Sequence, residues 1–164
     1  MGAVAKAAGI TTTADLIWGL ADGFEPEWDD HATAIAEGTF PLRIFMIPFE
    51  PKLVREYGSE MLNFLETKRA QGDDRLNTHG IKYVNDGSYP SMTLVMNEPG
   101  YLDDDNAHKG EVPWEDMVER MLPFWKAGIQ IHSHANGDRT LDMTLDTLEA
   151  LQRIHPRFDH RFTL

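Results

Sequence analysis

Along this chain, short apolar or β-branched runs alternate with stretches in which apolar residues recur at the spacing of a helix. Five runs are expected to form strands: residues 10–15, 41–48, 80–84, 129–134 and 158–164. Helices are expected at residues 31–37, 59–71, 112–127 and 139–154, and a further helix is expected to end near residue 8. Because strands and helices alternate, the pattern predicts an α/β fold with a parallel sheet and covering helices.

Polar residues and a proline mark the predicted helices. Asp30 and Asp138 are expected to be N-caps, and Pro123 is expected to kink or split the helix that contains it. The last helix carries one apolar stripe, which we expect to face the core: Leu141, Leu145, Leu148, Leu151 and Ile154. Residues 88–112 show no period, and so long a loop in a compact domain is typically functional. The whole chain, residues 1–164, is expected to form one domain.

The charge and the residue composition of the chain limit the kinds of molecule that it is expected to bind. The formal net charge is −12, from 27 acidic and 15 basic residues, and this argues against a nucleic acid or an anionic membrane as partner. No stretch approaches the length of about 18 apolar residues typical of a membrane span, and no secretory signal is recognisable, so we expect a cytoplasmic protein. The chain has no cysteine. Any metal would therefore be held by nitrogen and oxygen ligands, which suit Zn, Fe, Mn and Ni.

The densest group of polar side chains lies at the end of the fourth apolar run and directly after it. The sequence Ile129-Gln-Ile-His-Ser-His-Ala-Asn-Gly-Asp138 places two imidazoles, an amide and a carboxylate where strand gives way to helix. His132 and His134 are two residues apart, so on a strand they share a face. Neutral imidazole is a common metal ligand and a general base near neutral pH. On spacing alone, a polar strand end with two hydrogen-bonded histidines explains the pattern equally well.

Four segments, taken together, carry a resemblance to a known family: Gly9-Ile-Thr-Thr-Thr-Ala-Asp15, Ile81-Lys-Tyr-Val-Asn-Asp-Gly-Ser88 with Asn97-Glu-Pro-Gly-Tyr101, His134-Ala-Asn-Gly-Asp-Arg139, and Asp159-His-Arg-Phe-Thr-Leu164. In this order they resemble the second, fourth, fifth and sixth strand regions of the metal-dependent amidohydrolase superfamily. The amidohydrolase-3 branch, which includes N-substituted formamide deformylases, is the most similar. The resemblance implies a partial (β/α)8 TIM-like barrel, covering strands two to six, and hydrolysis of a non-peptide C–N bond in a small-molecule, amide-like substrate.

The resemblance also implies roles for individual residues. His134 matches a metal ligand, and Lys82 matches a strand lysine that can become a carbamate bridging two metals; these two are the candidate catalytic residues. A lysine within an apolar strand is expected to have a lowered pKa. His132 is interpreted first as an interior residue, with metal binding as the alternative. The candidate substrate contacts are Asp86, Ser88, Asn136, Asp138 and Arg161.

Each of these substrate contacts has a plainer alternative. Turn chemistry explains Asp86 and Ser88 nearly as well, Asp138 is first a cap, and Arg161 can instead pair with a carboxylate. The implied metal is a divalent ion, zinc first, with Fe, Mn or Ni as alternatives, and it would lower the pKa of a bound water to about 7. Tyr89, Met92, Met96 and Tyr101 are expected either to line an apolar pocket or simply to pack within the long loop.

The remaining metal ligands of the family are not matched in this chain. They are a His-x-His pair on the first strand, a Glu-His pair on the sixth and an aspartate on the eighth. We therefore predict that the chain is a fragment, inactive by itself, whose open strand edges favour a homo-oligomer. Two alternatives stay open. One is a non-catalytic small-molecule binding or scaffold domain derived from the same barrel, and the other is a complete small α/β protein that uses His132 and His134 in acid–base work without metal.

Overall fold

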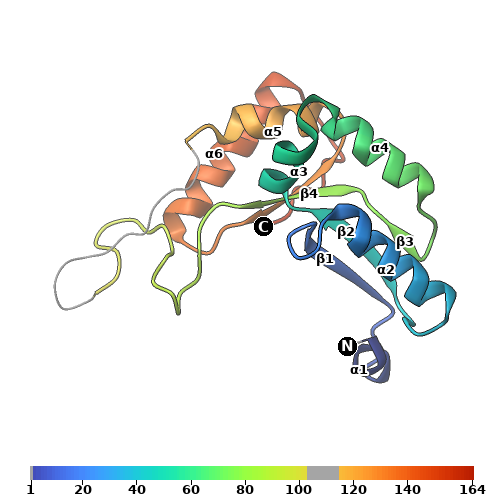
Figure 1. Ribbon diagram of the computed structural model, residues 1–164. Helices are drawn as coiled ribbons and strands as arrows, with labels where there is room; N and C mark the ends of the chain where they lie inside the picture. Colours follow the sequence, from blue (N-terminus) through green and yellow to red (C-terminus); the bar gives the residue numbers. More distant parts are fainter. Residues whose placement is uncertain (1, 103–114) are drawn as a thin grey trace. The chain divides into compact units, whose positions relative to one another are not determined.

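The computed structural model describes residues 2–102 and 115–164, so part of the predicted long loop lies outside the described residues. The chain divides into two compact units, Met1–Lys82 and Tyr83–Leu164, and each is described by itself. Figure 1 labels the helices and strands along the chain. Helices alternate with parallel strands, which confirms the predicted α/β class. The prediction of a single domain stays a prediction. No helix within the described ranges has the length and apolar character needed to cross a membrane.

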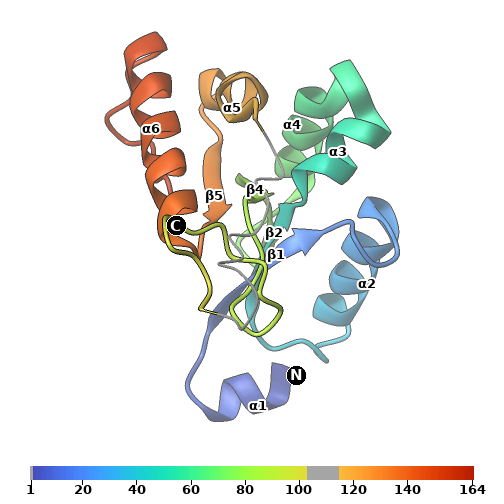
Figure 2. The ribbon, with the colours of Figure 1, turned by 90° about the vertical axis from the view of Figure 1, so that its left-hand side faces the viewer.

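The first unit is built on a parallel sheet of three strands in the order β1-β2-β3. Thr12 of the first strand pairs with Arg43 of the second, and Ile44 pairs with Leu76 of the third. Figure 2 shows the helices α2, α3 and α4 gathered on one side of β1 and β2. The elements are, in chain order, α1 (Gly2–Ala7), β1 (Thr12–Trp18), α2 (Phe24–Ala36), β2 (Arg43–Pro48), α3 (Glu50–Tyr57), the 3-10 helix η1 (Gly58–Glu60), α4 (Met61–Gln71) and β3 (Leu76–Asn77).

An aromatic cluster forms the core of the first unit. The Trp18 ring, at the end of β1, is fully buried and meets the Phe24 ring edge-on at 5.3 Å between centroids. Phe64 of α4 lies 5.8 Å from Trp18 and stacks on Tyr57 at 4.0 Å. The Trp18 indole N–H donates to the Phe24 carbonyl at 2.9 Å, so the buried ring keeps its hydrogen bond.

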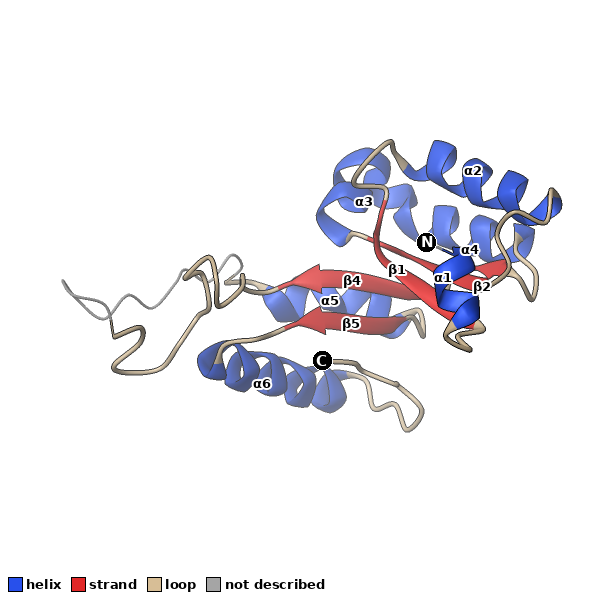
Figure 3. Ribbon diagram, turned by 90° about the horizontal axis from the view of Figure 1, so that it is seen from below, coloured by secondary structure: helices blue, strands red, loops and turns tan. Residues whose placement is uncertain are grey.

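The second unit is built around a pair of strands, β4 (Gly80–Val84), which spans the boundary between the units, and β5 (Gln130–His134). Helices α5 (Met117–Lys126) and α6 (Asp138–Ile154) pack against each other, and Figure 3 shows them beside β5. The core of this unit includes Tyr83, Met121, Phe124, Trp125, Ile131 and Leu151. Beyond α6, the Arg157 guanidinium lies 4.7 Å over the Trp125 ring and donates to the carbonyls of Gly128 and Ile129, which secures the turn into β5.

The strand predictions at residues 80–84 and 129–134 are confirmed, and so is the strand between the two prolines at 41 and 48. The helix predicted at residues 59–71 is present as η1 followed by α4, whereas α3 had no counterpart in the predictions. Pro123 lies inside α5, and the helix continues through it without being split.

The predicted start of the helix at residues 31–37 was wrong. Helix α2 begins at Phe24, so Asp30 lies inside it and is not an N-cap. The physical reason is a side chain from the first turn: the Glu27 carboxylate accepts the backbone N–H groups of Gly19 at 2.8 Å and Asp22 at 2.9 Å. These bonds tie the preceding loop to the helix and let the helix begin earlier than the apolar period suggested.

The strand predicted at residues 158–164 was wrong as well. This segment makes one isolated parallel bridge, between Thr163 and His132, and the Phe158 side chain is fully exposed. Arg161 adopts a positive φ of 51° and its guanidinium pairs with Asp159, two residues earlier. A positive φ is incompatible with a continuous strand, so the extended run is interrupted there.

The buried face of α6 also differs from the prediction. The residues that point into the unit are Thr140, Thr144, Thr147 and Leu151. Leu141, Leu145 and Ile154 are 37%, 45% and 52% exposed. The hydroxyls of Thr140 and Thr144 bond to buried polar side chains, described below, and these bonds hold the threonine face inward at the expense of the leucine stripe.

Candidate functional site

The two histidines of β5 share a face of the strand, as predicted. Exposure alternates along Gln130–His134, with Ile131 and Ser133 buried and His132 and His134 half-buried. The Asn85 backbone N–H, directly after β4, donates to the His134 carbonyl at 3.0 Å. The ends of β4 and β5 therefore lie side by side, which places the segments 85–88 and 134–138 next to each other.

The His134 imidazole is oriented by groups from both strand ends. Its Nε2 lies 2.8 Å from the Gly87 carbonyl oxygen and 2.9 Å from the Asn136 amide nitrogen, which itself donates to the Gly87 carbonyl at 3.1 Å. The Asp86 carboxylate is 3.6 Å away. The Gly87 oxygen can only accept, so this contact fits the tautomer with its proton on Nε2, which leaves a lone pair on Nδ1 for a proton or a metal ion. The Asn136 amide N–H fits the other tautomer, in which Nε2 accepts.

The Asp86 carboxylate is the acceptor on which the strand ends converge. Its side chain is fully buried. One oxygen accepts the backbone N–H of Asn136 at 3.0 Å, and the other accepts the Gly137 N–H at 2.7 Å and the Thr140 hydroxyl at 2.9 Å. The Val95 N–H approaches the same oxygen at 3.4 Å. Charge-assisted bonds of this kind are the stronger ones, so Asp86 fixes the turn that presents His134.

A second buried polar network lies beside this carboxylate. The Asn85 side-chain amide donates to the Ser133 hydroxyl at 2.6 Å and to the Thr144 hydroxyl at 3.2 Å. These three side chains are all buried. The network joins the end of β4 to β5 and α6, and it explains why α6 turns threonines rather than leucines inward.

Two glycines pack closely against the loop at the ends of β4 and β5. We call these adjoining segments, 85–88 and 134–138, the His134 corner. A Cβ atom on Gly137 would lie 2.0 Å from the Val95 carbonyl oxygen, and one on Gly87 would lie 1.7 Å from the Thr93 hydroxyl oxygen. Both glycines allow the segment 93–97 to approach the strand ends. Val95, Gly137 and Thr140 were not among the predicted site residues. The only sequence signal for them is the glycine after Asn136, because their contacts with Asp86 are long-range.

Asp138 connects the same corner to the loop. It is the first residue of α6 and the N-cap is Gly137, so the predicted capping role was wrong. Its Oδ1 accepts the backbone N–H of Asn97 at 2.9 Å and of Arg139 at 2.9 Å. The hydrogen bond from the Asn97 N–H is the main cause of a lowered pKa for the Asp138 carboxyl.

Ser88 and Arg161 make local contacts. The Ser88 N–H donates to the Thr93 hydroxyl at 3.0 Å, and its own hydroxyl lies 2.9 Å from that of Ser91, within a closed turn. Arg161 is exposed and forms two hydrogen bonds with the Asp159 carboxylate. Pairing with a carboxylate is one of the two interpretations considered for Arg161, and its contact with a substrate stays a prediction, as it does for Asp86, Ser88, Asn136 and Asp138.

Lys82 lies in β4, at the end of the first unit. It is half-buried and makes a parallel bridge with Phe49. Burial lowers the pKa of its amine, in the direction that the apolar strand predicted. Its partnership with His134 in a metal site stays a prediction.

A divalent metal site in a protein needs three or more ligands. Within residues 2–102 and 115–164, no group of three or more His, Asp or Glu side chains is placed to hold a metal ion. His134 offers one imidazole nitrogen, whereas both oxygens of Asp86 are taken by N–H and O–H donors. At these strand ends the described residues therefore offer one oriented imidazole, and they do not complete a site of three or more protein ligands.

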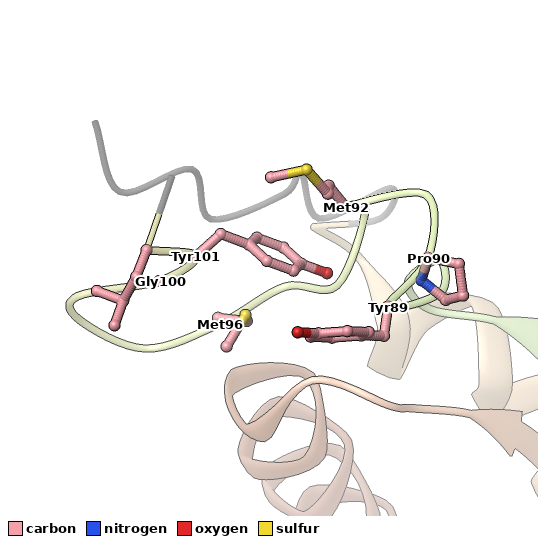
Figure 4. A pocket seen from close by; sticks show the side chains of 7 residues that line it. Tyr89, Pro90, Met92, Met96, Gly100 and Tyr101 are labelled. Carbon is pink, nitrogen blue, oxygen red and sulfur yellow. The ribbon is translucent and has the colours of Figure 1, made fainter. Parts of the chain in front are cut away.

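The loop after β4 contains a pocket of about 520 Å³. Its walls include the four predicted residues Tyr89, Met92, Met96 and Tyr101, together with Pro90 (Figure 4). Leu102 lines it as well. We call this the loop pocket. The interpretation of these four side chains as pocket-lining is confirmed, and what the pocket binds is considered below.

Comparison with known proteins agrees with this architecture. Residues 2–164 match the model of the amidohydrolase family. Two solved structures are similar, each an uncharacterized metal-dependent hydrolase with 22% sequence identity. The one from Pyrococcus horikoshii OT3 has a TM-score of 0.66 over 91% of this chain, and the one from Pyrococcus furiosus has a TM-score of 0.67 over 92%. This chain covers 28% and 30% of those chains. No curated protein matches it.

Proposed function

Since this chain belongs to the amidohydrolase family, we propose that it is part of a metal-dependent hydrolase that cleaves non-peptide, amide-like C–N bonds. The observation that carries this proposal is the His134 imidazole at the carboxyl end of β5, oriented through Nε2 by the Gly87 carbonyl with Nδ1 left for a ligand. Parallel α/β folds present reactive groups at such strand ends. The segments around Lys82 and His134 that resemble the N-substituted formamide deformylase-like branch support the finer assignment.

The proposal includes a barrel larger than this chain. Parallel strands with covering helices, and likeness to chains of which this one covers 28% and 30%, support a partial (β/α)8 barrel within a longer protein. In that protein the remaining ligands of the metal come from elsewhere. A bound divalent metal, zinc first and Fe, Mn or Ni otherwise, supplies Lewis acidity and a water of lowered pKa.

The residues of this chain would have different roles in hydrolysis. His134 is the proposed metal ligand, with Lys82 as a second ligand; His132 is proposed first as an interior residue, with metal binding as the alternative. Asp86 is a positioning residue, because its carboxylate holds the turn that carries His134. The proposed substrate contacts on the same strand ends and on the chain that follows are Ser88, Asn136, Asp138 and Arg161.

The isolated chain is proposed to be inactive. A hydrolytic metal site needs three or more protein ligands, and the described residues offer one oriented imidazole at the strand ends. Metal-dependent turnover by the purified 164-residue chain would contradict this.

The experiment that tests the function compares this chain with the full product of its coding sequence. Both are assayed against a panel of N-acyl and N-formyl amines with Zn, Fe, Mn or Ni added, and again in chelator. We expect turnover only by the longer product, lost in chelator and in His134→Ala. His155→Ala is the matched control, because His155 is an exposed histidine at the end of α6. Turnover that survives both chelator and His134→Ala would refute the proposal.

A non-catalytic binding domain is the second candidate. The loop pocket, together with the incomplete set of ligands in the described residues, favours it. It predicts that the full product of the coding sequence holds no metal. Stoichiometric Zn, Fe, Mn or Ni in that product, measured by elemental analysis, would exclude it.

A further inference from the structure

Among the residues that the structure describes, the side chains that line the loop pocket carry no charge. They are tyrosine, methionine, proline, leucine or glycine. The chain as a whole is 26% charged residues with a net charge of −12, so an uncharged pocket of about 520 Å³ is a local exception. Pockets of this size and lining accommodate small apolar ligands.

Several of these apolar side chains are open to solvent. Tyr89 is 71% exposed, Leu102 is 88% exposed and Met92 is 39% exposed. Figure 4 shows the Tyr89 and Tyr101 rings and the two methionine side chains around one space. A ligand that covers these surfaces removes apolar area from water, which is favourable in proportion to that area.

The pocket is held in shape before any ligand arrives. Tyr101 is buried at the back, and its hydroxyl oxygen accepts the Leu94 N–H at 3.1 Å. The Tyr89 and Tyr101 ring centroids are 6.0 Å apart with 39° between the planes. Met92 adopts a positive φ of 54°, uncommon for this residue type, and its N–H donates to the Tyr89 carbonyl at 3.0 Å. A wall fixed in this way loses little entropy on binding.

The same loop is attached to the strand ends that carry His134. The Val95 N–H approaches the Asp86 carboxylate, and the Thr140 N–H donates to the Val95 carbonyl at 3.3 Å. One residue after Met96, the Asn97 N–H donates to Asp138. The loop pocket and the His134 corner are therefore joined through a few short hydrogen-bonded steps.

We propose that the loop pocket binds an uncharged, flat apolar group, such as a substituted aromatic ring, and holds it as the apolar part of the amide-like substrate. The second part of this proposal rests on the proposed function. Flat rings suit the tilted pair of tyrosines, and thioether sulfur makes favourable contacts with aromatic edges. The uncharged side chains of the described walls favour a neutral group over an ammonium or a carboxylate.

The test is a titration of the 164-residue chain with its methionine methyl groups labelled by ¹³C and observed by NMR. The probes are benzyl alcohol, benzylammonium and benzoate, which share a ring and differ in charge. We expect benzyl alcohol to shift the Met92 and Met96 methyl signals saturably. The signals of Met46 and Met121, which are fully buried outside the pocket, should stay in place.

Two truncations of exposed aromatic side chains make the test specific. Tyr89→Ala removes a pocket wall, and Phe158→Ala removes an exposed ring outside it. We expect Tyr89→Ala to weaken benzyl alcohol binding by about 5-fold or more, and Phe158→Ala to leave it unchanged. Unshifted Met92 and Met96 signals, equal affinity in both variants, or tighter binding of either charged probe would overturn the proposal.

The substrate role is tested separately. If the full product of the coding sequence hydrolyses amides, neutral benzylic amides should have a KM at least about 5-fold lower than their methyl counterparts, and Tyr89→Ala should erase this preference. An unchanged preference overturns the substrate role. Because ligand binding is observed without turnover, failure of the proposed function would leave the binding result intact.

Discussion

At the scale of single residues, the Asp86 carboxylate decides how the strand ends are held. Replacing it by asparagine places an amide N–H₂ group against backbone N–H donors, so at least one donor loses its acceptor. We expect Asp86→Asn to lower the free energy of unfolding by about 3 kcal/mol, because bonds to a buried charge are the costly ones to lose. Urea denaturation followed by circular dichroism measures this.

Asp142→Asn is the matched control for that substitution. Asp142 is exposed, and its carboxylate accepts a single side-chain bond from Asn97 at 3.3 Å. We expect its effect to remain within about 0.5 kcal/mol. Equal losses in the two variants would show that the buried carboxylate contributes no more than an exposed one.

A second residue makes the stability depend on pH. The Asp73 Oδ1 accepts the N–H groups of Arg75 at 2.7 Å and Leu76 at 2.9 Å, and these bonds, first that of Leu76, lower the pKa of the Asp73 carboxyl from 3.8. A lowered pKa in the folded state means that the stabilisation is complete well above pH 3.8. It is lost as the pH falls through 3.8 toward the folded-state value.

Asp73→Asn tests this dependence. The difference in unfolding free energy between parent and variant, measured at pH 7 and again in steps below pH 4, should shrink as the pH falls. Asp74→Asn, at the neighbouring exposed position, is the matched control, and at pH 7 it should change the unfolding free energy by less than about 0.5 kcal/mol. A difference that grows on acidification would contradict the assigned sign.

The candidate site was predictable at the residue scale only in part. The shared face of His132 and His134 follows from the two-residue period of a strand, and the lowered pKa of Lys82 follows from an apolar strand. The partners of Asp86 did not follow, because Asn136 and Gly137 are about fifty positions away along the chain. An aspartate before Gly-Ser is also typical of a turn, so nothing in the sequence indicated that Asp86 accepts hydrogen bonds from Asn136 and Gly137.

At the scale of elements, α6 offers a direct comparison between two leucines. Leu151 is fully buried, whereas Leu145, on the same helix, is 45% exposed. We expect Leu151→Ala to lower the free energy of unfolding by about 3 kcal/mol, through lost transfer free energy and a residual cavity. Leu145→Ala should cost less than about 1 kcal/mol. Urea denaturation of both variants checks the pair, and a larger loss for Leu145 would contradict the exposure assigned to its side chain.

The same helix shows why elements are easier to predict than their orientation. The apolar period correctly indicated a helix near residues 139–154, but of the five residues in its stripe only Leu151 is buried, while Leu141, Leu145 and Ile154 are exposed. Period alone takes no account of hydroxyl groups, and Thr140 and Thr144 are turned inward by bonds to Asp86 and Asn85. Likewise, the start of α2 depended on the Glu27 carboxylate rather than on apolar spacing.

At the scale of the whole molecule, the family match and the metal chemistry disagree, because the described residues supply too few metal ligands. The family model matches nearly the entire chain, yet the described residues gather no group of three metal-binding side chains. The similar solved structures are chains more than three times as long. The longer protein proposed above would reconcile the family match with this shortage of ligands, and His134 should be assayed in that protein.

The exposed edge strand β1 favours self-association of the chain. In the three-stranded sheet β1 lies at the edge, and its residues Leu16 and Ile17 are 41% and 44% exposed. An edge strand with open apolar side chains is a template for pairing with a second chain, and a charge placed on it opposes that pairing. We expect the 164-residue chain to run as a homo-oligomer in size-exclusion chromatography with light scattering, and Leu16→Lys to shift it toward the mass of one chain. Val54→Lys, a similarly exposed position on α3, should not do so. A parent chain that is already monodisperse at the mass of one chain would show that this edge is protected without a partner.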